Sequence, residues 1–68
     1  MISYEPLWKL MKLRGASTYT LQVKIGISSS TIRRMKDGDS VSTNTLDALC
    51  RYFGCKIEDI VVYCPDET

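Results

Sequence analysis

Hydroxyl and guanidinium side chains share one short segment of the chain, residues 28–36, which has the sequence Ser-Ser-Ser-Thr-Ile-Arg-Arg-Met-Lys. In a helix, at about 100° per residue, Ile32 and Met35 lie on one face, and Ser30 lies on the opposite face between the two arginines. Serine and arginine side chains can reach base edges in the major groove of DNA, and arginine can bind O6 and N7 of guanine together. The alternative is a basic surface that contacts only solvent, and the segment alone does not decide between the two.

A second short helix is predicted immediately before this segment. Leu21 and Ile25 are four residues apart and form one apolar stripe. Gly26 supplies the permissive backbone that a helix end needs before a sharp turn. The two helices are therefore expected at residues 18–25 and 29–36. Two helices at this spacing, with glycine in the turn, favour DNA binding over simple solvation.

Apolar residues recur three and four positions apart in two further segments. They predict a first helix at residues 6–14 and another between Ser42 and Gly54. Trp8 lies beside the first stripe, where it is expected to cover the edge of the core; an aromatic contact with a partner is the alternative. The two stripes consist of Leu7, Leu10 and Met11, and of Leu46, Leu49, Cys50 and Phe53.

Helix ends are marked by serine and glycine. Ser17, Ser28 and Ser42 stand at predicted N-caps, where a hydroxyl oxygen can accept a backbone hydrogen bond. Each of the four glycines stands just past a predicted helix. A last helical turn at residues 56–60 is expected to return its two isoleucines to the core. The pattern predicts an all-α fold, a compact bundle of four to five short helices.

A short strand is predicted after the last helical turn, because Val61, Val62 and Tyr63 are β-branched or aromatic and precede Pro65. Two arrangements are open. The strand pairs with residues 2–4 of the same chain, as a small terminal β-strand pair over the helices, or it pairs with its own copy in a second subunit. Packing on the helices could support both pairings at once.

Charge is distributed unevenly along the 68 residues, although the net charge is only +1. Residues 1–36 contain seven basic side chains and one acidic one, a net charge of +6, whereas residues 37–68 contain two basic and seven acidic ones, a net charge of −5. Such a molecule attracts a phosphate backbone with its basic side and repels the backbone with its acidic side. A hydrophobic fraction of 44% indicates one folded domain, residues 1–68.

Several classes of protein are not expected. No apolar run approaches the ~20 residues of a membrane span, and the N-terminus lacks the basic and apolar segments of a signal peptide. We therefore expect a cytoplasmic protein without a membrane partner. A chain of this size leaves no room for a separate ligand-sensing domain, so neither a small-molecule ligand nor a cofactor is expected. Without histidine, a nucleophile triad, a phosphate-binding glycine loop or paired carboxylates, the chain is not expected to be an enzyme.

The three cysteines, Cys50, Cys55 and Cys64, form no CxxC pair. With no histidine in the chain, a structural zinc site of four ligands would need a carboxylate or a partner chain. Cys50 falls on the apolar stripe of its helix and is most simply a small buried hydrophobe. In a reducing cytosol we expect neither a metal site nor a disulfide.

Residues 7–60 resemble the Cro-type, lambda-repressor-like (XRE) family of helix-turn-helix transcriptional regulators. The family often has glutamine, which clamps a phosphate, at the position of Thr18; threonine can donate one hydrogen bond there, with less reach. The resemblance implies a compact helical domain that binds DNA through a helix-turn-helix at about residues 17–38. The matching positions are Leu7, Leu10, Gly15, Leu21, Ile25-Gly26-Ile27-Ser28, Ser30-Thr31-Ile32, Met35, Gly38, Ser42, Leu46, Leu49, Phe53-Gly54, Ile57 and Ile60.

The resemblance and the helical pattern together predict a sequence-specific regulator of transcription that binds double-stranded DNA, with the helix 29–36 in the major groove. Relatives of this size usually bind two-fold sites as dimers, so a homodimer is expected, with the segment 61–64 at its interface. Neither the operator sequence nor the choice between repressor and activator follows from the sequence. The alternative function is a protein-interaction module of the same fold, an antitoxin or antirepressor. The predicted DNA-binding residues are Thr18, Ser28, Ser29, Ser30, Arg33, Arg34 and Lys36.

Overall fold

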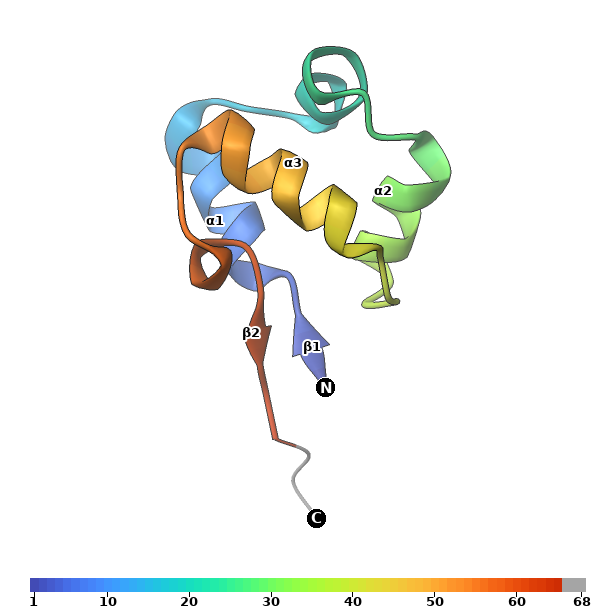
Figure 1. The fold of residues 1–68 in the computed structure, drawn as a ribbon, viewed down its shortest axis with the longest axis vertical. Helices are drawn as coiled ribbons and strands as arrows, with labels where there is room; N and C mark the ends of the chain where they lie inside the picture. The colour runs from blue at the N-terminus through green and yellow to red at the C-terminus, as the bar shows by residue number, and fades with distance from the viewer. Residues whose placement is uncertain (66–68) are drawn as a thin grey trace.

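Helices occupy most of the chain between two short strands (Figure 1). The computed structural model describes residues 1–65, and residues 66–68 lie outside the described part. The predicted helical bundle with a small terminal strand pair is confirmed. In chain order the elements are β1 (Ile2–Ser3), α1 (Glu5–Arg14), η1 (Thr20–Ile25), α2 (Ser29–Lys36), α3 (Thr43–Phe53), η2 (Ile57–Asp59) and β2 (Val62–Tyr63).

A serine caps the N-terminus of each of the two helices that flank the 37–42 loop, α2 and α3. The Oγ atom of Ser28 accepts a hydrogen bond from the Thr31 N–H at 3.2 Å, and Ser42 does the same for the Thr45 N–H at 3.3 Å. These bonds satisfy backbone donors that the first turn of a helix leaves without a partner. The predicted bounds of α2, and the predicted start and end of α3, are therefore confirmed.

The first helix of the helix-turn-helix differs from the prediction in winding and in its cap. η1 is a π-helix: the N–H of Gly26, at a φ of 85°, donates to the carbonyl of Leu21, five residues back. The prediction that Ser17 caps this helix is wrong. No side chain caps η1. The N–H of Ser17 donates to the Oγ1 atom of Thr20 at 3.2 Å, which is the backbone half of a capping box, but the Oγ atom of Ser17 accepts no hydrogen bond within residues 1–65.

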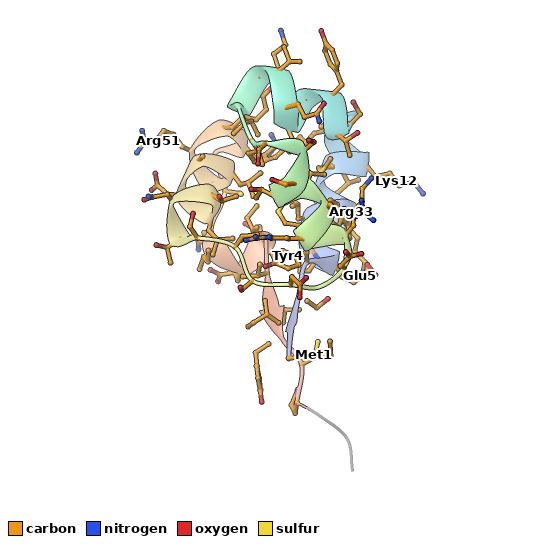
Figure 2. The ribbon with its side chains drawn as sticks, turned by 90° about the vertical axis from the view of Figure 1, so that its right-hand side faces the viewer. Met1, Tyr4, Glu5, Lys12, Arg33 and Arg51 are labelled. Atoms are coloured by element: carbon orange, nitrogen blue, oxygen red, sulfur yellow. The ribbon has the colours of Figure 1, made fainter. Side chains whose placement is uncertain are left out.

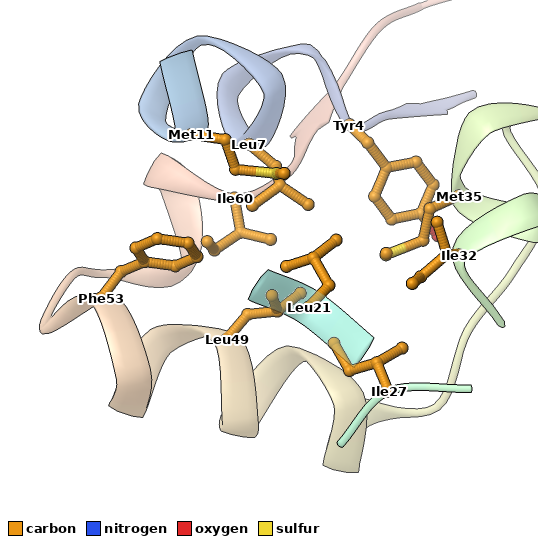
Figure 3. Packing of buried hydrophobic residues seen from close by; sticks show 10 residues of the cluster. All are labelled: Tyr4, Leu7, Met11, Leu21, Ile27, Ile32, Met35, Leu49, Phe53 and Ile60. Atoms are coloured by element: carbon orange, nitrogen blue, oxygen red, sulfur yellow. The ribbon is translucent and has the colours of Figure 1, made fainter. Parts of the chain in front are cut away.

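Ten buried side chains from all parts of the fold meet in one core (Figure 3). The turn residue Ile27 is among them. The expectation that Ile57 returns to the core is wrong, because Ile57 begins η2 at the surface and remains 49% exposed. Ile60 is buried, and its carbonyl accepts a hydrogen bond from the Leu7 N–H of α1 at 3.2 Å. The core residues are Tyr4, Leu7, Met11, Leu21, Ile27, Ile32, Met35, Leu49, Phe53 and Ile60.

The two strands form an antiparallel pair in which Ile2 is opposite Tyr63 and Ser3 is opposite Val62. The first of the two predicted arrangements, pairing within the chain, is thus present. Met1 and Cys64 exchange hydrogen bonds of 2.6 and 2.7 Å at the end of the ladder. Because bonded and non-bonded pairs alternate in antiparallel sheets, the backbone N–H and C=O of Tyr63 point to the outer edge of β2. The ribbon projects away from the helices (Figure 1).

A hydrogen bond from Tyr4 holds the loop that follows α2. Its ring is buried, and its hydroxyl donates a hydrogen bond of 2.7 Å to the backbone carbonyl of Asp39. Burial and the negative charge of Asp39 raise the pKa of this hydroxyl above its ordinary value. The bond therefore holds the C-terminal side of the helix-turn-helix against the start of α1.

We expect Tyr4→Phe to lower the free energy of unfolding by about 0.5–1.5 kcal/mol, because a part-buried hydrogen bond to the backbone carbonyl of Asp39 is lost. Urea unfolding at pH 7 measures this loss, and Tyr19→Phe, at an exposed tyrosine, is the control without effect.

Tyr4 of the unfolded chain ionises at about pH 10, below the pH at which Tyr4 of the folded chain ionises. Stability therefore falls as the pH rises above this value, and Tyr4→Phe should reduce that fall. Equal urea midpoints for both variants would contradict the role of the bond.

Candidate nucleic-acid interface

The second helix of the helix-turn-helix, α2, buries one face and exposes the other. Ile32 and Met35 are in the core, whereas Ser29, Ser30 and the basic residues are exposed. This division follows from the helical period, since apolar residues three positions apart point to the same side. The predicted division of the helix is therefore confirmed, and α2 faces the viewer in Figure 2.

Hydroxyl groups order the start of α2. Besides accepting the Thr31 N–H, the Oγ atom of Ser28 donates to Thr31 Oγ1 at 2.9 Å and lies 3.2 Å from the Oγ atom of Ser30. Ser28 is thus engaged in the cap itself. Ser29, which is exposed and next to the cap, has no such bond within residues 1–65. Of the three serines, Ser28 therefore fixes the helix start, and Ser29 and Ser30 form its outer surface.

The cations of α2 are available to a partner. Within residues 1–65, no carboxylate lies in ion-pair distance of Arg33, Arg34 or Lys36; the ion pair between Arg51 and Asp47, at 3.0 Å, is on α3. Helical spacing places Lys36 on the same side of α2 as Arg33, whereas Arg34 lies on the other side. The helix thus carries positive charge along both flanks of its serine surface, which suits a groove bounded by two phosphate strands.

Thr18 lies at the edge of a hollow between α1 and α2, with a volume of about 350 Å³. The structure thus places Thr18 and Lys36, two predicted site residues, on the same hollow. It adds Lys12 of α1, which the sequence pattern did not single out as a site residue. Only the packing of α1 beside α2 brings Lys12 there. The hollow is lined by Trp8, Met11, Lys12, Ala16, Ser17, Thr18 and Lys36.

Cys50 and Cys55 take no part in this surface. Cys50 and Cys55 are half-buried against the core at the end of α3, where the Cys55 N–H donates to the Cys50 carbonyl at 3.1 Å. Burial and the neighbouring Cys50 raise the pKa of the Cys55 thiol, which disfavours the thiolate that binds metals. Residues 1–65 contain no group of three potential metal ligands from cysteine, aspartate and glutamate. In the same range no helix is long and apolar enough to cross a membrane.

The fold and this surface are those of a helix-turn-helix DNA-binding domain. The model of the Cro/C1-type HTH DNA-binding domain family matches residues 6–66, and the chain belongs to this family. The chain is also similar to the crystal structure of the transcriptional regulator VanUg, with 34% sequence identity and a TM-score of 0.89 over 96% of this chain and 87% of the other. No curated protein matches the chain. Family and structural neighbour both indicate a DNA-binding regulator rather than an enzyme.

Proposed function

We propose that the chain, residues 1–68 acting as one domain, is a sequence-specific regulator of transcription that places α2 in the major groove of double-stranded DNA. The observation that carries the proposal is the exposed face of α2, where serines lie between arginines that have no ion-pair partner within residues 1–65. A helix of this kind fits the major groove, and its small hydroxyl side chains allow a close approach to the bases.

Each predicted residue has a distinct role in this proposal. Arg33 and Arg34 contact base edges or the phosphates beside them, and guanine is their preferred base. Ser29 and Ser30 make the close contacts, with little preference among bases, while Ser28 holds the helix start through its cap. Thr18 and Lys36 bind the backbone and set the position of the helix without reading sequence. Base preference then depends mainly on the two arginines and on DNA shape.

Selection of bound duplexes from a random pool tests this function directly. We expect an enriched sequence, and an affinity for it that falls steeply with salt, because phosphate contacts release counterions. A protein-interaction module of the same fold, an antitoxin or antirepressor, would enrich no sequence and bind its partner with little dependence on salt. That outcome would overturn the proposal.

The protein is further proposed to bind a two-fold site as a homodimer through the outer edge of β2. One helix-turn-helix of this size reads only a few base pairs, and dimers bind two half-sites about one helical turn apart. β2 offers an edge with outward backbone groups at Tyr63, whose side chain is 65% exposed, beside an exposed Val62. Antiparallel pairing with the same edge of a second copy would satisfy those groups and extend the sheet to four strands.

We expect Tyr63→Pro to shift the protein towards monomer, because proline removes the outward N–H while the pairs on either side of it stay intact. The effect is measured by sedimentation at tens of micromolar protein, and by comparing the affinity for a full operator with the affinity for a single half-site. Tyr63→Thr, which keeps the N–H and introduces a β-branched side chain suited to a strand, is the matched control. A parent protein that is monomeric and binds each half-site independently would rule out the dimer.

A further inference from the structure

The hollow between α1 and α2 combines an apolar floor with a cationic rim. Met11 is buried, and Trp8 is half-buried against the core, so the floor belongs to the fixed part of the fold. The rim carries the exposed side chains of Lys12, Thr18 and Lys36. Lys12 projects outward from α1 in Figure 2. The hollow is therefore lined by two lysines and a threonine from three segments of the chain.

Nothing among the lining residues compensates this positive charge. None of them carries a carboxylate, and neither lysine has an ion-pair partner within residues 1–65. Glu5 and Asp37 line an adjoining hollow, which shares Trp8 and Lys36 with this one. An anion between the two lysines would be attracted by both.

The position of the hollow indicates which anion it holds. Lys36 lies three residues after Arg33 on the same side of α2, and Thr18 precedes η1, the first helix of the helix-turn-helix. When the second helix of such a motif lies in the major groove, the first helix crosses the backbone. With α2 placed in this way, the hollow would open towards one of the two phosphate strands that bound the groove.

We propose that this hollow binds one phosphate group of the DNA backbone, with the ammonium groups of Lys12 and Lys36 and the hydroxyl of Thr18 as its ligands. The proposal rests on the DNA-binding function proposed above and adds Lys12 to it. A threonine at position 18 has a short reach, and the two lysines supply the charge and length that it lacks. The site positions the domain on the duplex and contributes nothing to base preference.

The test compares Lys12→Gln with Lys24→Gln on the selected duplex. Both variants lose one positive charge, but Lys24 lies on η1 beside a different hollow. We expect Lys12→Gln to lower affinity about three- to tenfold at low salt, equally for all sequences. For each bound subunit, the slope of log affinity against log salt should become shallower by about 0.9, the value for one phosphate contact. Lys24→Gln should change the affinity less and leave the slope almost unaltered.

A double-mutant cycle with Lys36→Gln adds a second readout. Because both lysines bind the same phosphate, their combined loss should be smaller than the sum of the single losses. Additive losses, or a Lys12→Gln variant that binds DNA no more weakly than Lys24→Gln, would overturn the phosphate site. The DNA-binding function would still hold in that case if the parent protein selects a sequence. A parent protein that binds no duplex would overturn both proposals.

Discussion

Leu49→Ala is expected to reduce the free energy of unfolding by about 2–5 kcal/mol, through lost burial and the cavity that remains. Leu49 is fully buried, on the face of α3 that packs into the core shown in Figure 3. Natural domains are stable by only about 5–15 kcal/mol, and a chain of 68 residues has one small core to supply it. The substitution should therefore remove a large share of the total stability.

Urea unfolding followed by helical circular dichroism measures this loss. Leu13→Ala is the matched control, because it makes the same chemical change at a helical side chain that is 84% exposed, and it should alter stability by no more than about 0.5 kcal/mol. Phe53→Ala, at the end of the same helix, should cost an amount similar to Leu49→Ala. A Leu49→Ala protein that unfolds at the same urea concentration as Leu13→Ala would contradict the placement of α3 in the core.

The helices with local signals could be predicted from the sequence alone. α2 and α3 begin after serines that do cap them, and their apolar residues repeat at the helical period. Gly15 and Gly54 end α1 and α3 with the positive φ that glycine tolerates. In these segments propensity, capping and burial all favour the same structure, so tertiary packing did not have to override any of them.

The predictions that failed depend on details of bonding and packing that the apolar pattern does not contain. Leu21 and Ile25 are four residues apart, and this spacing does not distinguish a π-helix from an α-helix. Ser17 has a hydroxyl suited to capping, but only its N–H forms a hydrogen bond, to Thr20. Ile57 and Ile60 look alike in sequence, and it is the bond from Leu7 of α1 that holds the Ile60 backbone against the core.

The candidate site likewise has one part that could be predicted from the sequence and one part that could not. The exposed surface of α2 could be predicted, because all of its residues belong to one helix and a single period orders them. Lys12 could not, since it reaches the hollow only through the packing of α1 beside α2. The strand pair also needed the structure, because the sequence left both pairing with residues 2–4 and pairing with a second subunit open, and favoured the latter as the dimer interface. A site built from several segments requires the tertiary fold.

The largest effect on binding is expected for Arg33→Ala and Arg34→Ala. A two-contact arginine–guanine interaction is worth about 1–3 kcal/mol of discrimination, so at least one substitution should weaken binding to the selected duplex about tenfold or more. In a dimer on a two-fold site each substitution removes two contacts, and the expected loss doubles to about 2–6 kcal/mol. Binding to unrelated duplexes should fall much less, because phosphate contacts elsewhere remain.

Both arginines are exposed and without ion-pair partners in residues 1–65, so neither substitution should unfold the protein. Thermal melts of each variant check this before titration of selected and scrambled duplexes. Arg51→Ala is the matched control: it removes the same side chain from α3 and breaks an exposed pair with Asp47, worth no more than about 1 kcal/mol. It should bind the selected duplex nearly as the parent does. If Arg33→Ala and Arg34→Ala both melt and bind like Arg51→Ala, α2 is not the recognition helix.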